Sequence, residues 1–154
     1  MNKKKVLIII SVILTVSFLL LLYLTLGKDK VSPDPVVIIE EFQNNKEVFI
    51  AIKDYAIKTD GYLFIGMQGN MVNYDEDKAL PIADENIILS ISNLKSNLNF
   101  LAIYEGQDSL YFVRHDDRKY EKGIAYMSNG EIPLSIVKSK FLGDNWYYYE
   151  SGKV

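Results

Sequence analysis

The stretch FLAIYEGQDSLYFVRH, residues 100–115, decides the fold that this sequence predicts. It consists of two runs rich in aromatic and β-branched side chains, Phe100–Tyr104 and Leu110–His115, on either side of a loop that contains Gly106. Two such runs joined by a short glycine-containing loop are typical of a β-hairpin. The sequence therefore predicts an antiparallel pair of strands here, and the neighbouring segments can be placed around it.

The segments that follow extend this sheet. Lys122–Met127 is a further strand candidate, and it ends at Ser128–Asn129–Gly130, residue types that favour turns. Leu134–Leu142 and Trp146–Glu150 flank Gly143–Asp144–Asn145 and predict a second hairpin. The last third of the chain is therefore expected to be β-structure.

The first segment of the domain reads as helix. Asp34–Pro35 is a helix-start signal, because Asp can cap free N–H groups and proline fits the first turn. The apolar residues that follow, on a 3.6-residue period, are Ile38, Phe42, Phe49, Ile52 and Ala56. Asn44 and Glu47 form a capping box. The sequence is therefore compatible with one helix that continues to about Lys58 or with two helices separated near Asn44.

A strand and a second helical segment lie between this helix and the hairpin. Gly61 is placed to cap the helix C-terminus, and Tyr62–Met67 reads as a buried strand. Residues 70–83 are polar and acidic and are expected to form a loop. Asp84 is the expected N-cap of a helix with Ile87, Ile91, Leu94 and Leu98 on one face. This order predicts an α+β domain with two or three helices packed on one face of a mainly antiparallel sheet of about five strands.

A membrane anchor is expected before this domain. Val6–Leu26 carries no charged residue, and a helix of that length spans roughly 31 Å, close to the hydrocarbon thickness of a bilayer. Lys3–Lys5 precede it without an acidic residue, which predicts a cytoplasmic N-terminus by the positive-inside tendency. The predicted organisation is a cytoplasmic tip (1–5), a single transmembrane helix (6–26), a linker (27–35) and an extracytoplasmic domain (36–154).

The alternative for the N-terminal segment is a cleavable signal peptide. The apolar run is longer than a typical signal core, and Leu24–Gly27 does not resemble an A-x-A cleavage site. Lipoprotein processing requires a cysteine, and the chain has none. The retained single-pass anchor in the cell membrane is therefore preferred.

Charge limits the partners of the exported part. Residues 31–154 contain twelve Lys and Arg against nineteen Asp and Glu, a net charge near −7. A segment this acidic is not suited to nucleic acid, because the phosphate backbone attracts basic surfaces. The expected partners are the membrane, through the anchor, and a protein of the cell envelope.

The candidates for catalysis or metal binding are few. His115 precedes Asp116, so a base lies beside carboxylates, and a nucleophilic serine would need this histidine because the chain has no other. No serine lies in a G-x-S-x-G elbow. Asn73–Asp77 has oxygen ligands spaced as in a calcium loop, but Lys78 and Asp84 stand where such a loop needs Gly and Glu. We therefore expect no metal and no cofactor.

The run Trp146–Tyr149 is the most distinctive local feature. Side chains alternate along a strand, so Trp146 and Tyr148 should face one side and Tyr147 and Tyr149 the other. Together with Tyr111 or Tyr126 on a neighbouring strand, Tyr147 and Tyr149 are candidates for an aromatic binding surface for a protein or a sugar. The alternative is that these rings pack the sheet and its helices.

Four segments together resemble small membrane-anchored extracytoplasmic proteins of low-GC Gram-positive bacteria. They are the helix with Phe42, Asn45, Lys46 and Phe49, the strand Tyr111–Arg114, the stretch Gly123–Tyr126 and the closing run Gly143–Tyr149. The resemblance implies no activity, because those proteins are mostly uncharacterised.

Two hypotheses from different classes remain. The first is a membrane-anchored interaction module, not an enzyme, that binds an envelope protein or neutralises a toxin. The second is an envelope hydrolase or carbohydrate-binding protein that uses His115 and nearby carboxylates.

Overall fold

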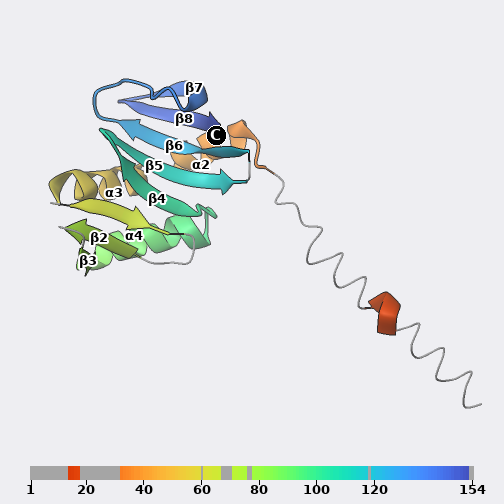
Figure 1. Ribbon diagram of the computed structural model, residues 1–154. Coiled ribbons are helices and arrows are strands. Elements are labelled where there is room, and N and C mark those ends of the chain that lie inside the picture. The colour runs from red at the N-terminus through yellow and green to blue at the C-terminus, as the bar shows by residue number, and fades with distance from the viewer. Residues whose placement is uncertain are drawn as a thin grey trace, which may run out of the picture. The chain divides into compact units, whose positions relative to one another are not determined.

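The computed structural model describes residues 14–17, 32–59, 61–66, 71–75, 78–117 and 119–152 (Figure 1). The chain divides into two compact units, Met1–Ser32 and Pro33–Val154. In the first unit residues 14–17 are helical, and the rest of the predicted span 6–26 lies outside the described residues. Within the part of the chain that is described, no helix has the length and apolarity to cross a membrane.

The second unit is an α+β domain, as predicted. Its described helices are α2 (Pro35–Asn44), α3 (Lys46–Lys58) and α4 (Glu85–Ser96). Its described strands are β1 (Tyr62–Ile65), β2 (Met71–Asp75), β3 (Lys78–Pro81), β4 (Ala102–Gly106), β5 (Ser109–Asp116), β6 (Tyr120–Met127), β7 (Ile136–Gly143) and β8 (Trp146–Gly152).

These strands form one sheet in the order β3-β2-β1-β4-β5-β6-β8-β7. Every neighbouring pair is antiparallel, which confirms the predicted sheet type. Both predicted hairpins are present. In the second, Asp144 and Asn145 take φ values of 51° and 62°, as a tight hairpin turn requires. Eight described strands replace the five or so expected.

The additional strands are β2 and β3, in a segment that was expected to be a polar loop. β2 pairs with β1 over four residues, from Tyr62 opposite Tyr74 to Ile65 opposite Met71. All four residues of β3 are exposed. β3 therefore buries no apolar face, and its sequence lacks the alternation of apolar and polar residues that identifies a strand. Its place in the sheet comes from backbone pairing with β2.

The first helical segment is two helices, which decides between the two alternatives left open by the sequence. Asp34 caps α2 as predicted, with its carboxylate accepting from the Val36 amide at 2.8 Å. The expected capping box at Asn44 is wrong, because Asn45 is the N-cap of α3 and makes no side-chain cap bond. Asn45 separates α2 from α3, and its side-chain amide donates to the Glu41 carbonyl at 2.9 Å. The expected cap at Gly61 is wrong, because α3 ends at Thr59, whose amide and hydroxyl both donate to the Tyr55 carbonyl.

One face of the sheet carries the main hydrophobic core. The three helices cover this face (Figure 1), and their inward side chains meet those of five strands. At its centre the Trp146 ring lies 5.2 Å from Phe42 and 5.8 Å from Phe112, measured between centroids. The predicted packing of helices on one side of the sheet is therefore present, and the opposite side has no helix among the described residues.

An ion pair fixes α2 to β5 where that strand is irregular. The register of β5 against β6 shifts between Val113 and His115, which leaves Arg114 as an extra residue. The Arg114 guanidinium donates to both carboxylate oxygens of Glu41, at 2.9 and 3.1 Å. A two-pronged contact of this kind sets orientation as well as distance, so the bulge positions the first helix on the sheet.

Candidate functional site

The uncovered face of the sheet carries a second, smaller cluster. Its buried members are Tyr111, Ala125, Met127 and Tyr149, with Tyr104, Ile136 and Tyr147 packed against them. These residues alternate along their strands with residues of the main core, so they all point away from the helices. Tyr126 belongs to the main core instead, and its ring lies 5.3 Å from Trp146.

Two tyrosine hydroxyl groups of this cluster bind the same carboxylate. Tyr104 and Tyr149 each donate a hydrogen bond of 2.7 Å to the same oxygen of Glu121. Burial, together with the adjacent Glu121 carboxylate, raises the pKa of both tyrosines. Both side chains are therefore neutral hydrogen-bond donors, and the cluster holds β4, β6 and β8 together.

Of the four predicted binding residues, the structure brings three to one face. Tyr149 is fully buried there, and Tyr111 is 9% exposed, so neither ring offers much surface. Tyr147 is partly exposed and stacks obliquely on Phe141 with 5.2 Å between centroids. Tyr126 lies on the opposite face. Among the four predicted residues, Tyr147 is therefore the one that is partly exposed and borders an exposed surface.

That surface is built mainly from residues that the sequence did not single out. Ile132, Leu134, Val137 and Phe141 are 43%, 103%, 64% and 60% exposed. The Tyr147 hydroxyl donates to the Gly130 carbonyl at 3.3 Å, which ties the β6–β7 loop to β8 beside Phe141. We call Ile132, Leu134, Phe141 and Tyr147 the β7 surface; Val137 projects on the other side of β7, next to Gly152. Its sequence signal was the apolar content of Leu134–Leu142, which was interpreted as one strand of the second hairpin.

An open pocket of about 470 Å³ adjoins this surface. Its walls are the β4–β5 turn, Gly106–Ser109, and the β6–β7 loop, including Ile132 and Leu134, with Tyr111 between them. The size is within the range of ligand sites. No group of three or more His, Cys, Asp or Glu side chains that could hold a metal ion occurs among the described residues. The side chains of the calcium-loop candidate Asn73–Asp77 lie outside this description.

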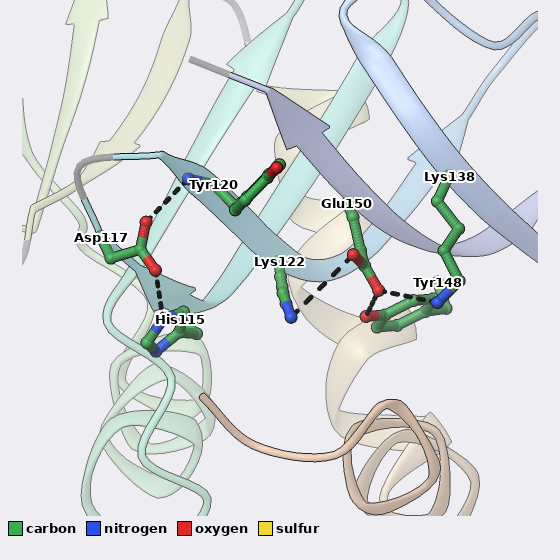
Figure 2. Close-up of polar contacts among 7 residues, drawn as sticks. All are labelled: His115, Asp117, Tyr120, Lys122, Lys138, Tyr148 and Glu150. Carbon is green, nitrogen blue, oxygen red and sulfur yellow. Dashed lines mark hydrogen bonds and ion pairs between the residues drawn. The ribbon is translucent and has the colours of Figure 1, made fainter. Parts of the chain in front are cut away.

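His115 lies on the helix-covered side of the sheet, away from the tyrosine cluster. It pairs in register with Lys122, and Figure 2 shows its ring directed at Asp117. The imidazole Nε2 lies 3.2 Å from the Asp117 carboxylate, and the residue is 3% exposed. Asp117 is occupied by the turn itself, because its other oxygen accepts from the amides of Lys119 and Tyr120 at 2.6 and 2.7 Å. This pair therefore closes the β5–β6 turn.

The Asp117 carboxylate makes the turn sensitive to acid. Hydrogen bonds from the Tyr120 and Lys119 amides and from His115 lower the pKa of Asp117 to about 2. A carboxyl group whose pKa is lower in the folded state contributes stability above its unfolded pKa of about 4 and loses it as the pH falls through about 2. We expect Asp117→Asn to reduce the unfolding midpoint at pH 6, and the difference from the parent protein to shrink between about pH 4 and pH 2. Urea unfolding over this range measures it.

The matched control for this titration is Asp108→Asn, in the β4–β5 turn. Asp108 also lies in a tight turn, with a φ of 55°. Its variant removes a carboxylate for which the described residues show no hydrogen bond from a backbone amide, so it should unfold at nearly the same urea concentration as the parent protein. A difference between Asp117→Asn and the parent that stays constant from pH 6 to pH 2 would contradict the assignment.

A second polar group on this side is centred on Glu150 (Figure 2). Its carboxylate accepts from the Tyr148 hydroxyl at 2.7 Å and from Lys138 at 3.1 Å, and Lys122 lies 3.9 Å away. Burial acts to raise the pKa of Glu150, but the hydrogen bonds from Tyr148 and Lys138 outweigh it and the pKa is lowered. The ionised carboxylate therefore ties β7 to β8 and β6.

No protein-family model, curated protein or solved structure matches this chain. We therefore infer its function from the arrangement of its own residues. The described part offers the exposed β7 surface, an open pocket beside it, and a buried histidine in β5 that contacts Asp117.

Proposed function

We propose that this protein is a membrane-anchored, extracytoplasmic interaction module that binds another protein of the cell envelope or neutralises a toxin. The observation that carries the proposal is the β7 surface. Three of its large apolar side chains, Ile132, Leu134 and Phe141, are more than 40% exposed and lie within ten residues of one another in the sequence. Clustered exposed apolar side chains with an aromatic member are typical of protein interfaces.

The surroundings of this surface support a protein partner. Phe141 and Tyr147 supply rigid aromatic area, and hot spots of binding energy are enriched in such side chains. Polar residues of the β6–β7 loop, among them Asn129 and Glu131, line the pocket that adjoins this surface. An apolar centre with a polar rim is the arrangement seen in protein–protein interfaces, whereas the exported part, with its net charge near −7, is poorly suited to anionic headgroups.

The alternative, an enzyme that uses His115, has less support. A general base must reach the proton that it removes, at about 3 Å or through one water. His115 is 3% exposed, and its Nε2 already contacts Asp117, whose carboxylate is bound by two backbone amides. The pocket beside the β7 surface is lined by residues of the β4–β5 turn and the β6–β7 loop and does not include His115.

The location in the proposal rests on the N-terminal sequence. Val6–Leu26 is uncharged and long enough to span a bilayer, and Lys3–Lys5 favour a cytoplasmic N-terminus. Protease added to intact cells should then degrade an epitope at the C-terminus while leaving a cytoplasmic marker protein whole. Protection of the epitope in intact cells, with degradation after lysis, would contradict the orientation.

Site-specific photo-crosslinking tests the β7 surface. A photoreactive amino acid placed at Leu134 or Phe141 of the full chain in its native membrane should give an adduct with a discrete protein, identified by mass spectrometry. The matched control is Leu89 in α4, which is also a large exposed apolar residue, at 67%. Lipid adducts alone, or the same protein adducts from Leu89, would overturn the proposed surface.

Two substitutions separate the proposal from the enzymatic alternative. Phe141→Ser should remove the adduct formed at Leu134, because it deletes an aromatic anchor of the surface. His115→Ala should leave that adduct and the cellular phenotype unchanged, provided that folding is intact. A phenotype lost in a folded His115→Ala variant, with the adduct retained, would instead support the enzyme.

A further inference from the structure

The two edges of the sheet differ in how well they are protected against pairing. β3 forms one edge, and it is short, with Lys78 at its start and Pro81 at its end. Proline cannot donate a ladder hydrogen bond, and short charged edges resist the addition of further strands. β7 forms the other edge with eight residues, Ile136–Gly143, and contains no proline.

β7 is also the most exposed of the long strands. Five consecutive residues, 137–141, are exposed, and in the described part of the chain β7 pairs with β8 alone. Its outer backbone N–H and C=O groups therefore face away from the sheet with no strand beside them. Its pairing with β8 shifts register between Ile136 and Lys138 and again between Phe141 and Gly143, so the regular stretch is Lys138–Phe141. That stretch can accept an added strand through main-chain hydrogen bonds.

We propose that β7 accepts an extended acidic segment of a partner protein as an additional strand of the sheet. This inference rests on the proposed function and specifies how the partner is bound. Main-chain hydrogen bonds would provide the pairing, and side chains that alternate between the two faces would provide the selectivity. The two lysines of β7 and its exposed aromatic residue, Phe141, fall on different faces.

Lysines occupy one face of the edge. Lys138 lies opposite Glu150, and Lys140 lies opposite Tyr148, so both project on the helix-covered side. Lys138 is 62% exposed although it contacts Glu150, and Lys140 is exposed as well. Acidic residues of an added strand would lie directly across from these two lysines, where pairs of opposite charge stabilise a sheet.

An apolar side chain marks the other face. Phe141 lies opposite Tyr147 and projects on the side without helices, next to the β6–β7 loop. Apolar residues of the same added strand would extend this contact. The edge therefore fits a segment in which acidic residues alternate with apolar ones.

A second copy of this chain fits the edge less well. Antiparallel pairing of two β7 strands about Ser139 sets Lys138 of each copy opposite Lys140 of the other. Pairing about Lys138 or Lys140 sets that lysine opposite itself. Like charges directly opposite each other destabilise a strand pair, so the lysines that attract an acidic partner also oppose self-association.

Peptide binding to the full chain in detergent micelles tests the inference. The probe is a short fluorescent peptide of alternating Val and Glu, and the control peptide has Lys in place of Glu. We expect the Glu peptide to bind, and hydrogen exchange of the amides in residues 137–141 to slow in its presence. Failure of the Glu peptide to bind, or equal binding of the Lys peptide, overturns the inference.

Charge reversal at the edge gives the matched comparison. Lys140→Glu should weaken the Glu peptide by about tenfold, the size expected when attraction across a strand pair becomes repulsion, and should allow the Lys peptide to bind. Lys78→Glu on the opposite edge should change neither. Lys138→Gln provides a milder second variant that adds no acidic group beside Glu150.

The two proposals fail in different ways. Adducts at Leu134 and Phe141 without peptide binding would leave the interaction surface in place and exclude the added strand. Peptide binding at 137–141 without any protein adduct would show an accepting edge on a molecule that has no partner at the β7 surface.

Discussion

Replacing Trp146 with Ala should lower the free energy of unfolding by about 4 kcal/mol, the cost of truncating a large buried aromatic side chain. Trp146 is 1% exposed and packs against rings from α2, α3, β5 and β6. Its removal opens a cavity at the point where both helices meet the sheet. Because small domains are stable by only about 5–15 kcal/mol, the variant should unfold at much lower urea concentration.

The neighbouring residue provides the control for this prediction. Tyr147→Ala also removes an aromatic ring from β8, but on the side without helices, where the ring is partly exposed. Its cost should be about 1 kcal/mol, as for most substitutions outside the core. Urea unfolding followed by circular dichroism measures both variants. Equal losses would mean that the main core does not depend on Trp146.

Gly123→Ala should also be severely destabilising, by about 3 kcal/mol, because it forces two backbones apart. A Cβ atom at this position would collide with the carbonyl oxygen of Phe112 in the adjacent strand. The approach is this close beside the bulge in β5, where the register shifts between Val113 and His115. Neither partner can move without breaking the ladder between β5 and β6.

Gly152→Ala is the matched control. A Cβ atom there would lie 3.5 Å from the Val137 side chain, which is ordinary van der Waals contact. Its free energy of unfolding should stay within about 0.5 kcal/mol of the parent value. If Gly123→Ala lowered the free energy of unfolding as little as Gly152→Ala, that result would contradict the close approach of β5 and β6 at the bulge.

The sequence predicted the parts of the fold that depend on neighbouring residues. The caps at Asp34 and Asp84, the buried face of α4 and both hairpins follow from local hydrogen bonds and from periodicity, and all of them are present. The break at Asn45 was one of two alternatives. Local propensity could not decide between them, because the apolar residues keep the same helical period on both sides of Asn45.

The candidate site was predicted only in part. The alternation of Trp146–Tyr149 was correct, since Trp146 and Tyr148 face the helices and their neighbours do not. The exposure of each ring could not be predicted, because Tyr149 is covered by Tyr104 and Tyr111 from other strands. The exposed apolar residues of the β7 surface were missed because their exposure also depends on which strands lie beside β7.

The sequence by itself determined the β4–β5 and β7–β8 hairpins, the helix starts at Asp34 and Asp84 and the two chemical faces of β8, because each depends on residues close together in the chain. Only the tertiary structure decided that residues 71–81 form β2 and β3, that His115 in β5 is buried, and that β7 lies at an open edge. Those outcomes depend on which distant segments lie side by side, and burial and edge position are properties of that arrangement and not of any segment alone.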